Sequence, residues 1–293
     1  MAVCLSGSWW LLTGNLGPSL RHRRPGSFSK VRQMKIVVLV KYVPDATGER
    51  VFGADGTVDR QAGDGLLSEL DEYALEQALR IADDGDDVEV VALTLGPDDA
   101  ATAIKRALQM GAAAGIHVCD DAVHGTDSLG TSTILAAAVR KAAPDLVLCG
   151  MASTDGSMGV VPAMLAERLG WPAATFGATL ELVDGRVRIR RDTDTASLSV
   201  EAPLPAVVSV TDQAGEARYP SMKGILAAKK KAVETWSLAD LGVDPAGVGL
   251  SAAWTTVIDT APRPPKQPGR LVPDENGTGA QALVEFLVAG KYV

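Results

Sequence analysis

The chain is poor in cysteine, histidine and aromatic residues. Its 293 residues include 3 cysteines, 3 histidines and 4% aromatic side chains. Cys4, Cys119 and Cys149 form no CxxC pair, a pattern typical of a reducing compartment without a disulfide framework. So few histidines exclude a histidine-rich metal site and give poor support to a hydrolytic triad. Cys149, which ends an apolar run, is better explained as a small core residue than as a nucleophile.

The chain also lacks a long hydrophobic run and an excess of positive charge. No apolar stretch approaches the roughly 20 residues of a membrane-spanning helix, so we expect a soluble protein without membrane insertion. Because 36 acidic residues outnumber 28 basic ones, the formal net charge of −8 disfavours a general binder of nucleic acid or membrane surfaces. A hydrophobic fraction of 46% is enough for a sizeable core, so we expect one large domain, with or without an appendage.

Residues 1–33 differ from the rest because they contain no acidic side chain and five basic ones. The apolar run SWWLL has no basic stretch ahead of it, so a secretory signal explains it poorly. A transit peptide and a start codon assigned too far upstream are the alternatives, since Met34 opens the first convincing strand. We therefore treat residues 1–33 as an N-terminal extension outside the fold.

From Met34 onward the apolar pattern alternates between strands and helices. Apolar runs, the first of them β-branched, indicate strands at residues 36–40, 88–95, 116–119 and 146–149. Between them, helical spacing predicts a helix from about Asp71, with Glu72 and Glu76 facing solvent, and a second helix capped by residues 96–99. The expected buried stripes are Ala74, Leu75, Ala78, Leu79 and Ala82, then Ala100, Ile104, Ala107 and Leu108, then Ile134, Leu135, Ala138, Val139 and Ala142. This alternation predicts an α/β fold of the Rossmann-like kind, with a mainly parallel, twisted sheet and helices on both faces.

The stretch Gly150–Gly159, GMASTDGSMG, joins a buried strand to a helix over residues 160–169. Small residues at a helix N-terminus let a phosphate approach backbone N–H groups, so one hypothesis is a phosphate-binding loop. The alternative is an ordinary connection in which Ser157 caps the helix, because neither the Walker pattern nor GxGxxG is present. Residues 39–41 and 95–97 also follow strands, so the three segments are expected to surround one ligand-binding crevice.

Beyond the loop the pattern changes to antiparallel strands and a looser C-terminal part. Residues 180–190 alternate about Asp184-Gly185, which predicts a β-hairpin, and residues 206–210 predict a further strand. Lys229–Lys231 are better explained as the C-terminus of a helix than as a nucleic-acid patch. From residue 232 a Pro-rich linker at 262–268 and a helix at 280–289 indicate an arm. We therefore predict an α/β nucleotide-binding domain at 34–231 and, at 232–293, an arm and helix that pack on a partner subunit.

Several short motifs occur in one order along the chain, from Met34 to the C-terminus. They are MKIVVLVKYVPD (34–45), DEYALE (71–76), ALQMGA (107–112), DGSMG (155–159) ahead of MLAERLGWP (164–172), PLPAVV (203–208) and RYPSMKGILAAKKK (218–231). Together they resemble the β subunit of electron transfer flavoprotein. The resemblance implies an electron carrier rather than an enzyme, in the bacterial cytoplasm, or in the mitochondrial matrix if the extension is a transit peptide.

The resemblance also implies cofactors and partners. In that family an α subunit carries most of the FAD contacts and the β subunit holds a structural AMP. The heterodimer takes electrons from dehydrogenases, such as the acyl-CoA dehydrogenases of fatty acid β-oxidation, and passes them to a membrane quinone oxidoreductase. Relatives usually carry a threonine and a glutamine where this chain has Met158 and Val160. By position, the nucleotide contacts would be Leu39, Ser68, Glu69, Leu70, Asp71, Leu95, Gly150, Asp155, Gly156, Ser157, Met158 and Gly159.

The segment RYPSMKG carries a second expectation. Composition alone favours Met222 packing inward at the start of a helix. The resemblance instead implies a projecting loop whose apolar tip docks on dehydrogenases, formed by Tyr219, Pro220, Ser221, Met222, Lys223 and Gly224. Two other functions are weighed against the carrier: a stand-alone adenine-nucleotide-binding regulatory module, which does not need the arm, and an ATP-using enzyme, for which the loop lacks suitably placed Lys, Ser or Thr.

Overall fold

The computed structural model describes residues 33–48, 50–85, 87–261, 264–266, 268–269, 271–274 and 276–293. Apart from Gln33, the predicted N-terminal extension lies outside the described residues. Three positions of the expected linker, 262, 263 and 267, lie outside them as well. None of the helices in the described part of the chain combines the length and the apolar character needed to cross a bilayer.

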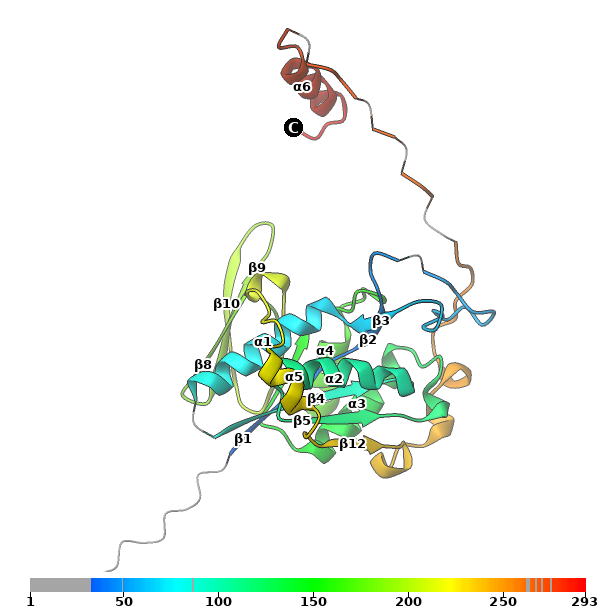
Figure 1. The fold of residues 1–293 in the computed structure, drawn as a ribbon, viewed down its shortest axis with the longest axis vertical. Coiled ribbons are helices and arrows are strands. Elements are labelled where there is room, and N and C mark those ends of the chain that lie inside the picture. Colours follow the sequence, from blue (N-terminus) through cyan, green and yellow to red (C-terminus); the bar gives the residue numbers. More distant parts are fainter. Residues whose placement is uncertain are drawn as a thin grey trace, which may run out of the picture.

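Seven parallel strands form the central sheet, in the spatial order β12-β5-β4-β1-β6-β11-β7; β12, β5, β4 and β1 are labelled in Figure 1. They are β1 (Met34–Leu39), β4 (Val88–Leu95), β5 (Ala114–Val118), β6 (Leu146–Gly150), β7 (Ala173–Gly177), β11 (Ala206–Val210) and β12 (Val233–Trp236). The chain runs outward from β1 through β4 to β5 and then returns to place β6 on the other side of β1. The strand order therefore reverses at β1, and ligands bind at such points in α/β sheets.

Helices cover both faces of this sheet, which confirms the predicted fold class. The helices α1 (Glu69–Asp84) and α2 (Ala101–Met110) lie on one face, and α3 (Ser128–Ala142) and α4 (Val161–Leu169) lie on the other. Alternate residues of β1 point to opposite faces, because Ile36 and Val38 belong to the first core cluster and Val37 and Leu39 to the second. The predicted apolar stripes of α1, α2 and α3 are buried, except that Ala82 is only half-buried.

Two helix details differ from the prediction. Glu76 does not face solvent: it is 4% exposed, because Arg80 and Arg218 pair with it. The segment 96–99 does not cap α2 with a side chain; a short 3-10 helix at Asp98–Ala100 precedes α2 instead, and no side chain bonds to either N-terminus. Other short 3-10 helices span Asp121–Val123, Asp212–Ala214, Ala239–Leu241, Pro245–Gly247 and Leu250–Ala252.

Two antiparallel sheets complete the body. The predicted hairpin is confirmed as β8 (Thr179–Val183) and β9 (Arg186–Asp192), and Asp184 and Gly185 both have the positive φ, 50° and 70°, that a tight hairpin turn favours. A third strand, β10 (Ser197–Pro203), pairs with β9 and was not predicted. A two-stranded sheet of β2 (Tyr42–Pro44) and β3 (Gly65–Leu67) lies between β1 and α1 in sequence.

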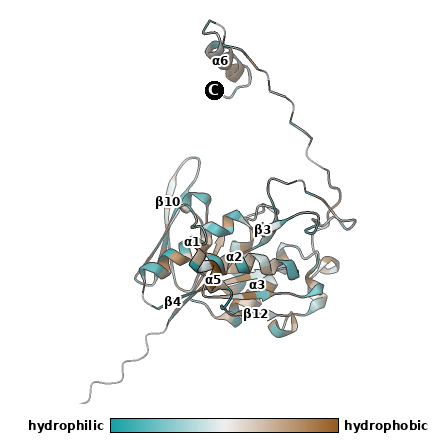
Figure 2. Cartoon of the chain, in the orientation of Figure 1, coloured by the Kyte–Doolittle hydropathy of each residue, from teal (hydrophilic) through white to brown (hydrophobic). Residues whose placement is uncertain are grey.

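The C-terminal part divides into a packed and an exposed segment. β12 forms an edge of the seven-stranded sheet, and Trp236, Leu238 and Val248 are buried in the core, so the α/β body extends beyond residue 231. The helix α5 (Met222–Ala228) has Lys229 as its C-cap residue, so Lys230 and Lys231 follow the helix and do not lie in its last turn as predicted. The last helix, α6 (Gly279–Ala289), lies apart from the body and carries hydrophobic residues that no neighbouring element buries (Figures 1 and 2).

A candidate nucleotide-binding crevice

Three connections meet at the carboxyl ends of neighbouring strands. Residues 39–41 follow β1, residues 95–97 follow β4, and Gly150–Gly159 follows β6. Because β4 and β6 both pair with β1, these segments lie at one edge of the sheet, beside the point where the strand order reverses. The strand pattern of the sequence predicted this meeting of the three connections, and a ligand-binding crevice between them stays a prediction.

Asp71, in the first turn of α1, ties two of these strand ends together. Its Oδ2 accepts the backbone N–H of Lys41 at 2.9 Å, and its Oδ1 accepts that of Gly150 at 3.1 Å. Burial raises the pKa of this carboxyl to about 7, although both amide donors oppose the increase. A side chain at Gly150 would force α1 and β6 apart, because a Cβ there would lie 2.7 Å from the backbone oxygen of Leu70.

Asp155 lies at the centre of an ion-pair cluster. Its side chain is 3% exposed, and it accepts hydrogen bonds from Lys41 Nζ at 2.8 Å and Arg60 Nη2 at 2.7 Å. Burial acts to raise the pKa of Asp155, but the Lys41 and Arg60 cations together hold it well below its usual range. Arg60 also donates to the carbonyl of Tyr42 at 2.9 Å, so it links β2 to the loop after β6. Sequence reasoning missed Arg60, because no local pattern marks its place in the polar connection before β3.

The backbone of the Gly150–Gly159 loop is tightly turned. Ser157 and Gly159 have positive φ values of 53° and 66°, and the N–H of Ser157 bonds to the carbonyl of Ser153 at 2.9 Å. The α4 helix begins after Val160 without a side-chain cap, with Pro162 in its first turn. Ser157 therefore does not cap α4, so this detail of the alternative is wrong, while phosphate binding by the loop stays a prediction.

Buried hydroxyl groups make the crevice suitable for a polar ligand. Within the described residues, the side-chain oxygens of Ser68, Thr94 and Thr154 are buried without a hydrogen-bond partner. They belong to the start of α1, the end of β4 and the loop after β6, which are the elements at the edge of the sheet where the strand order reverses. An unpartnered buried hydroxyl costs about 1–3 kcal/mol, which a ligand with donors and acceptors would offset. An adenine nucleotide is such a ligand, so the residues present fit the expected group.

The predicted contact residues do not all share this environment. Ser68, Asp71 and Gly150 are buried, and Leu39 and Leu95 end β1 and β4. Glu69, Gly156, Ser157 and Met158 are exposed at the rim, and Leu70 and Gly159 are half-buried. Thr94 and Thr154 were not predicted, although Thr154 lies inside the stretch that was singled out. Asp155 bonds to protein cations, and its contact with a nucleotide stays a prediction.

The predicted docking residues form a separate surface on α5 and the turn before it. Tyr219 is 89% exposed and Met222 is 74% exposed, so Met222 does not pack inward. Ser221 caps α5 by accepting the N–H of Gly224 at 3.0 Å. The side chains of Tyr219 and Met222 therefore project from a turn whose backbone is held by the Ser221 cap.

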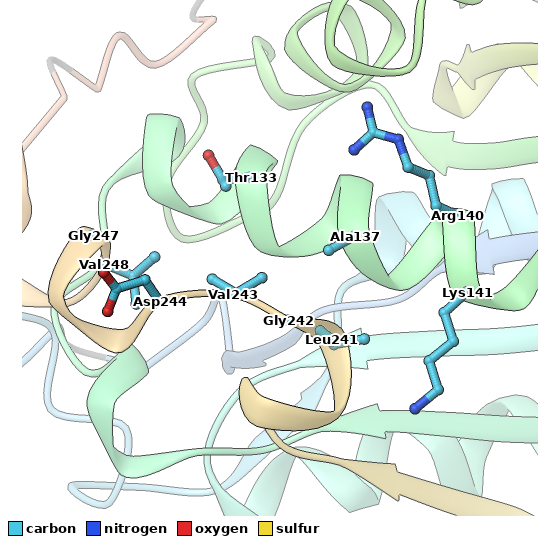
Figure 3. Close-up of a pocket in the computed structure, with 10 residues that line it drawn as sticks. All are labelled: Thr133, Ala137, Arg140, Lys141, Leu241, Gly242, Val243, Asp244, Gly247 and Val248. Carbon is cyan, nitrogen blue, oxygen red and sulfur yellow. The ribbon is translucent and has the colours of Figure 1, made fainter.

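A shallow hollow of about 660 Å³ lies between α3 and residues 241–248, outside the crevice (Figure 3). Its two cations already have partners in the protein. Lys141 Nζ lies 4.3 Å from the centre of the Trp236 ring and donates to the carbonyl of Asp240, while Arg140 donates to the carbonyl of Arg168. The hollow therefore carries no argument for a ligand.

The strand order with its reversal at β1, the helices on both faces and the turned loop after β6 define an α/β protein of the Rossmann-like class. Comparison with known proteins narrows this class. A family model described as "Electron transfer flavoprotein domain" matches residues 55–241. The "Electron transfer flavoprotein subunit beta" of Mycobacterium tuberculosis (strain ATCC 25618 / H37Rv) is 44% identical over 264 residues, which cover 88% of this chain and 99% of that protein.

Two relatives with lower sequence identity belong to the same kind of protein. The "Caffeyl-CoA reductase-Etf complex subunit CarD" of Acetobacterium woodii is 31% identical over 87% of this chain and 97% of its own length. The "Electron transfer flavoprotein subunit beta" of Megasphaera elsdenii is 30% identical over 89% of this chain and 100% of its own length. The chain belongs to the electron transfer flavoprotein β-subunit family, and the resemblance seen in the sequence motifs is confirmed.

Proposed function

We propose that this chain pairs with an α subunit to form an electron transfer flavoprotein that carries electrons from dehydrogenases, such as acyl-CoA dehydrogenases, towards a membrane quinone oxidoreductase. FAD is held mainly by the α subunit and is partly enclosed by this chain. The flavin supplies the redox chemistry, while the protein positions it and admits partners. Because the relatives above are bacterial, we place this complex in the bacterial cytoplasm.

The observation that carries the proposal is the apolar surface of the C-terminal arm. Trp254 is 87% exposed, Ile258 97% and Phe286 61%. Exposed apolar surface of this kind is rare in a monomer and typical of a protein interface. A stand-alone nucleotide-binding module would not need such an arm, whereas a subunit does.

Co-expression with the adjacent open reading frame tests the pairing. The purified complex is expected to show the visible absorbance of bound flavin, with one FAD per heterodimer. This chain expressed alone is expected to be colourless and prone to aggregate. A stable monomer with stoichiometric FAD would contradict the division of roles between the subunits.

We further propose that the crevice holds AMP with a structural role. The unpartnered hydroxyls and the turned glycine-containing loop support this proposal, while Met158 and Val160 remove two polar side chains that relatives usually have. A ligand that binds only the folded state stabilises it, by about 2.7 kcal/mol at a hundredfold excess over its dissociation constant. Mass spectrometry of the heat-denatured heterodimer should find AMP beside FAD, in about equal amounts; FAD without AMP would show that the site has been lost.

The projecting turn Tyr219–Gly224 is proposed as the docking loop for dehydrogenases. Met222 suits this role because its side chain is flexible and polarisable and is exposed here. One anchored apolar side chain contributes on the order of 2 kcal/mol to binding. Met222→Ala should therefore raise the KM of a dehydrogenase for the carrier, while flavin content and reduction by dithionite stay unchanged. An unchanged KM would contradict the docking role.

A further inference from the structure

The chain crosses α1 immediately before the docking loop, and α1 holds it there. Gln77 Nε2 donates to the carbonyl of Ala214 at 2.8 Å, and Arg80 Nη2 donates to the carbonyl of Glu216 at 3.1 Å. Residues 215–218, which follow the short 3-10 helix Asp212–Ala214, have no regular secondary structure of their own. Side chains of α1 therefore fix the course of the chain that enters the docking loop.

Glu76 is the centre of this contact. Its Oε2 accepts the backbone N–H of Arg218 at 3.1 Å and Arg218 Nε at 2.7 Å, and its Oε1 accepts Arg218 Nη2 at 3.2 Å and Arg80 Nε at 2.8 Å. Arg218 Nη2 also donates to Asp83 Oδ2 at 2.8 Å. Burial acts to raise the pKa of Glu76, but the bonds from Arg218 and Arg80 lower it below its ordinary value, so Glu76 is charged. Both oxygens of the nearly buried Glu76 carboxylate therefore bond to Arg218, the residue that precedes Tyr219.

The far side of the docking loop is fixed as well. A Cβ at Gly224 would lie 2.4 Å from the carbonyl oxygen of Gln109, so α5 approaches the end of α2 at backbone distance. Beyond α5, Lys231 Nζ donates to the carbonyl of Leu108 at 2.9 Å. Tyr219 and Met222 therefore project from a turn that is anchored to α1 on one side and to α2 on the other.

We propose that Glu76 is a positioning residue for electron transfer: through Arg218 it holds the docking loop in the conformation that a partner binds. This inference rests on the proposed docking role of Tyr219–Gly224. A loop that is already ordered loses less conformational entropy on binding, so its affinity for a rigid partner is higher. Glu76 acts on docking and not on the flavin, because its contacts lie on α1 and the segment before the loop.

The test uses the intact heterodimer with Glu76→Gln, which keeps the shape of the side chain but removes its charge. We expect the KM of a dehydrogenase for the carrier to rise about twofold to tenfold at unchanged kcat. Flavin content and the rate of reduction by dithionite should not change. Hydrogen exchange of the amides in residues 218–224 should become faster, which is a readout independent of any partner.

Glu72→Gln is the matched control. Glu72 lies on the same helix and accepts Arg106 Nε at 2.8 Å, and none of its described bonds reaches residues 212–218. It should leave both KM and exchange at residues 218–224 unchanged. If Glu76→Gln does not fold, Arg218→Lys replaces it, because lysine keeps the positive charge but cannot reproduce the forked contacts of arginine.

The outcomes separate this inference from the docking proposal. The positioning role is overturned if hydrogen exchange at residues 218–224 does not change in Glu76→Gln. It is also overturned if that exchange becomes faster but KM stays the same, while Met222→Ala raises KM. Both outcomes leave the docking role of Tyr219–Gly224 intact. A normal KM in Met222→Ala overturns the docking role itself, and the positioning role with it. Equal changes in Glu76→Gln and Glu72→Gln also overturn the inference, because they would reflect a general loosening of α1.

Discussion

The α/β body and the C-terminal arm differ in the burial of similar apolar side chains. Leu148 in β6 is fully buried, whereas Leu283 in α6 is 58% exposed, and the arm before α6 exposes Trp254 and Ile258. Both regions are rich in apolar residues, yet only the body supplies its own neighbours for them. A run of apolar residues in the sequence therefore predicts a buried surface, but it does not indicate whether that surface packs on the same chain or on a partner.

The largest expected effect comes from making one change in each region. Leu148→Ala should lower the free energy of unfolding by about 2–5 kcal/mol, because it removes buried methyl groups and leaves a cavity. Leu283→Ala should change that free energy by no more than about 0.5 kcal/mol in the chain alone, as is usual for exposed sites. Urea unfolding of the isolated chain measures the difference, with both variants and the parent at a protein concentration low enough to prevent aggregation.

The same two variants can be compared in the presence of the α subunit, where the affinity of the heterodimer is measured. If α6 packs on that subunit, Leu283→Ala should weaken the heterodimer while Leu148→Ala leaves the affinity of the folded chain nearly unchanged. A Leu283→Ala variant that unfolds as easily as Leu148→Ala would show instead that α6 folds back on the body.

A second prediction concerns the carboxyl of Asp71, which is buried and has a pKa raised to about 7. Below pH 3.8 the carboxyl is protonated in both the folded and the unfolded chain. As the pH rises to about 7 the unfolded chain releases this proton and the folded chain retains it, so stability falls over this window and levels off above it. The shift of about 3 units corresponds to about 4 kcal/mol at most, since one unit is 1.36 kcal/mol.

The measurement is the unfolding free energy of the parent and of Asp71→Asn from pH 4 to pH 8. The parent should lose stability relative to the variant as the pH rises. A difference that does not vary with pH would show that the two amide donors, from Lys41 and Gly150, keep the carboxyl ionised throughout.

Most of the body could be predicted from the sequence because its signals are local. The run Ile36–Val38 and the helical spacing of α1 to α3 depend on neighbours within a few residues, and strand ends in a parallel sheet then locate the crevice. β12 escaped prediction because it has only four residues, three of them exposed at the sheet edge. Glu76 and Arg60 escaped it because their partners, Arg218 and Asp155, lie 142 and 95 residues away. Residues paired over such distances leave no periodic pattern.

A third prediction tests how closely the crevice is packed. Gly150→Ala should destabilise the body by about 1–3 kcal/mol, because its Cβ would collide with the backbone of Leu70 and the carboxyl of Asp71. Gly63→Ala is the control, since a Cβ there meets nothing within 4 Å. Thermal unfolding of both variants measures the effect, and equal melting temperatures would show that α1 moves away from β6 without cost.

The smallest expected effect lies at the junction between body and arm, where Asp127 contacts both. Its Oδ1 accepts the N–H of Gly130 at 3.0 Å and so caps α3, while its Oδ2 accepts the N–H of Trp254 at 2.9 Å, where the exposed arm begins. Asp127→Ala loses both bonds and should cost about 1 kcal/mol, the usual value of an N-cap. Asp127→Asn keeps an oxygen for the cap but turns an NH₂ group towards Trp254, so stability should stay within about 0.5 kcal/mol of the parent while the Trp254 amide exchanges faster. Hydrogen exchange and urea unfolding of the two variants separate the two roles. A Trp254 amide that stays protected in Asp127→Ala would show that the arm is held to the body by contacts other than this carboxylate.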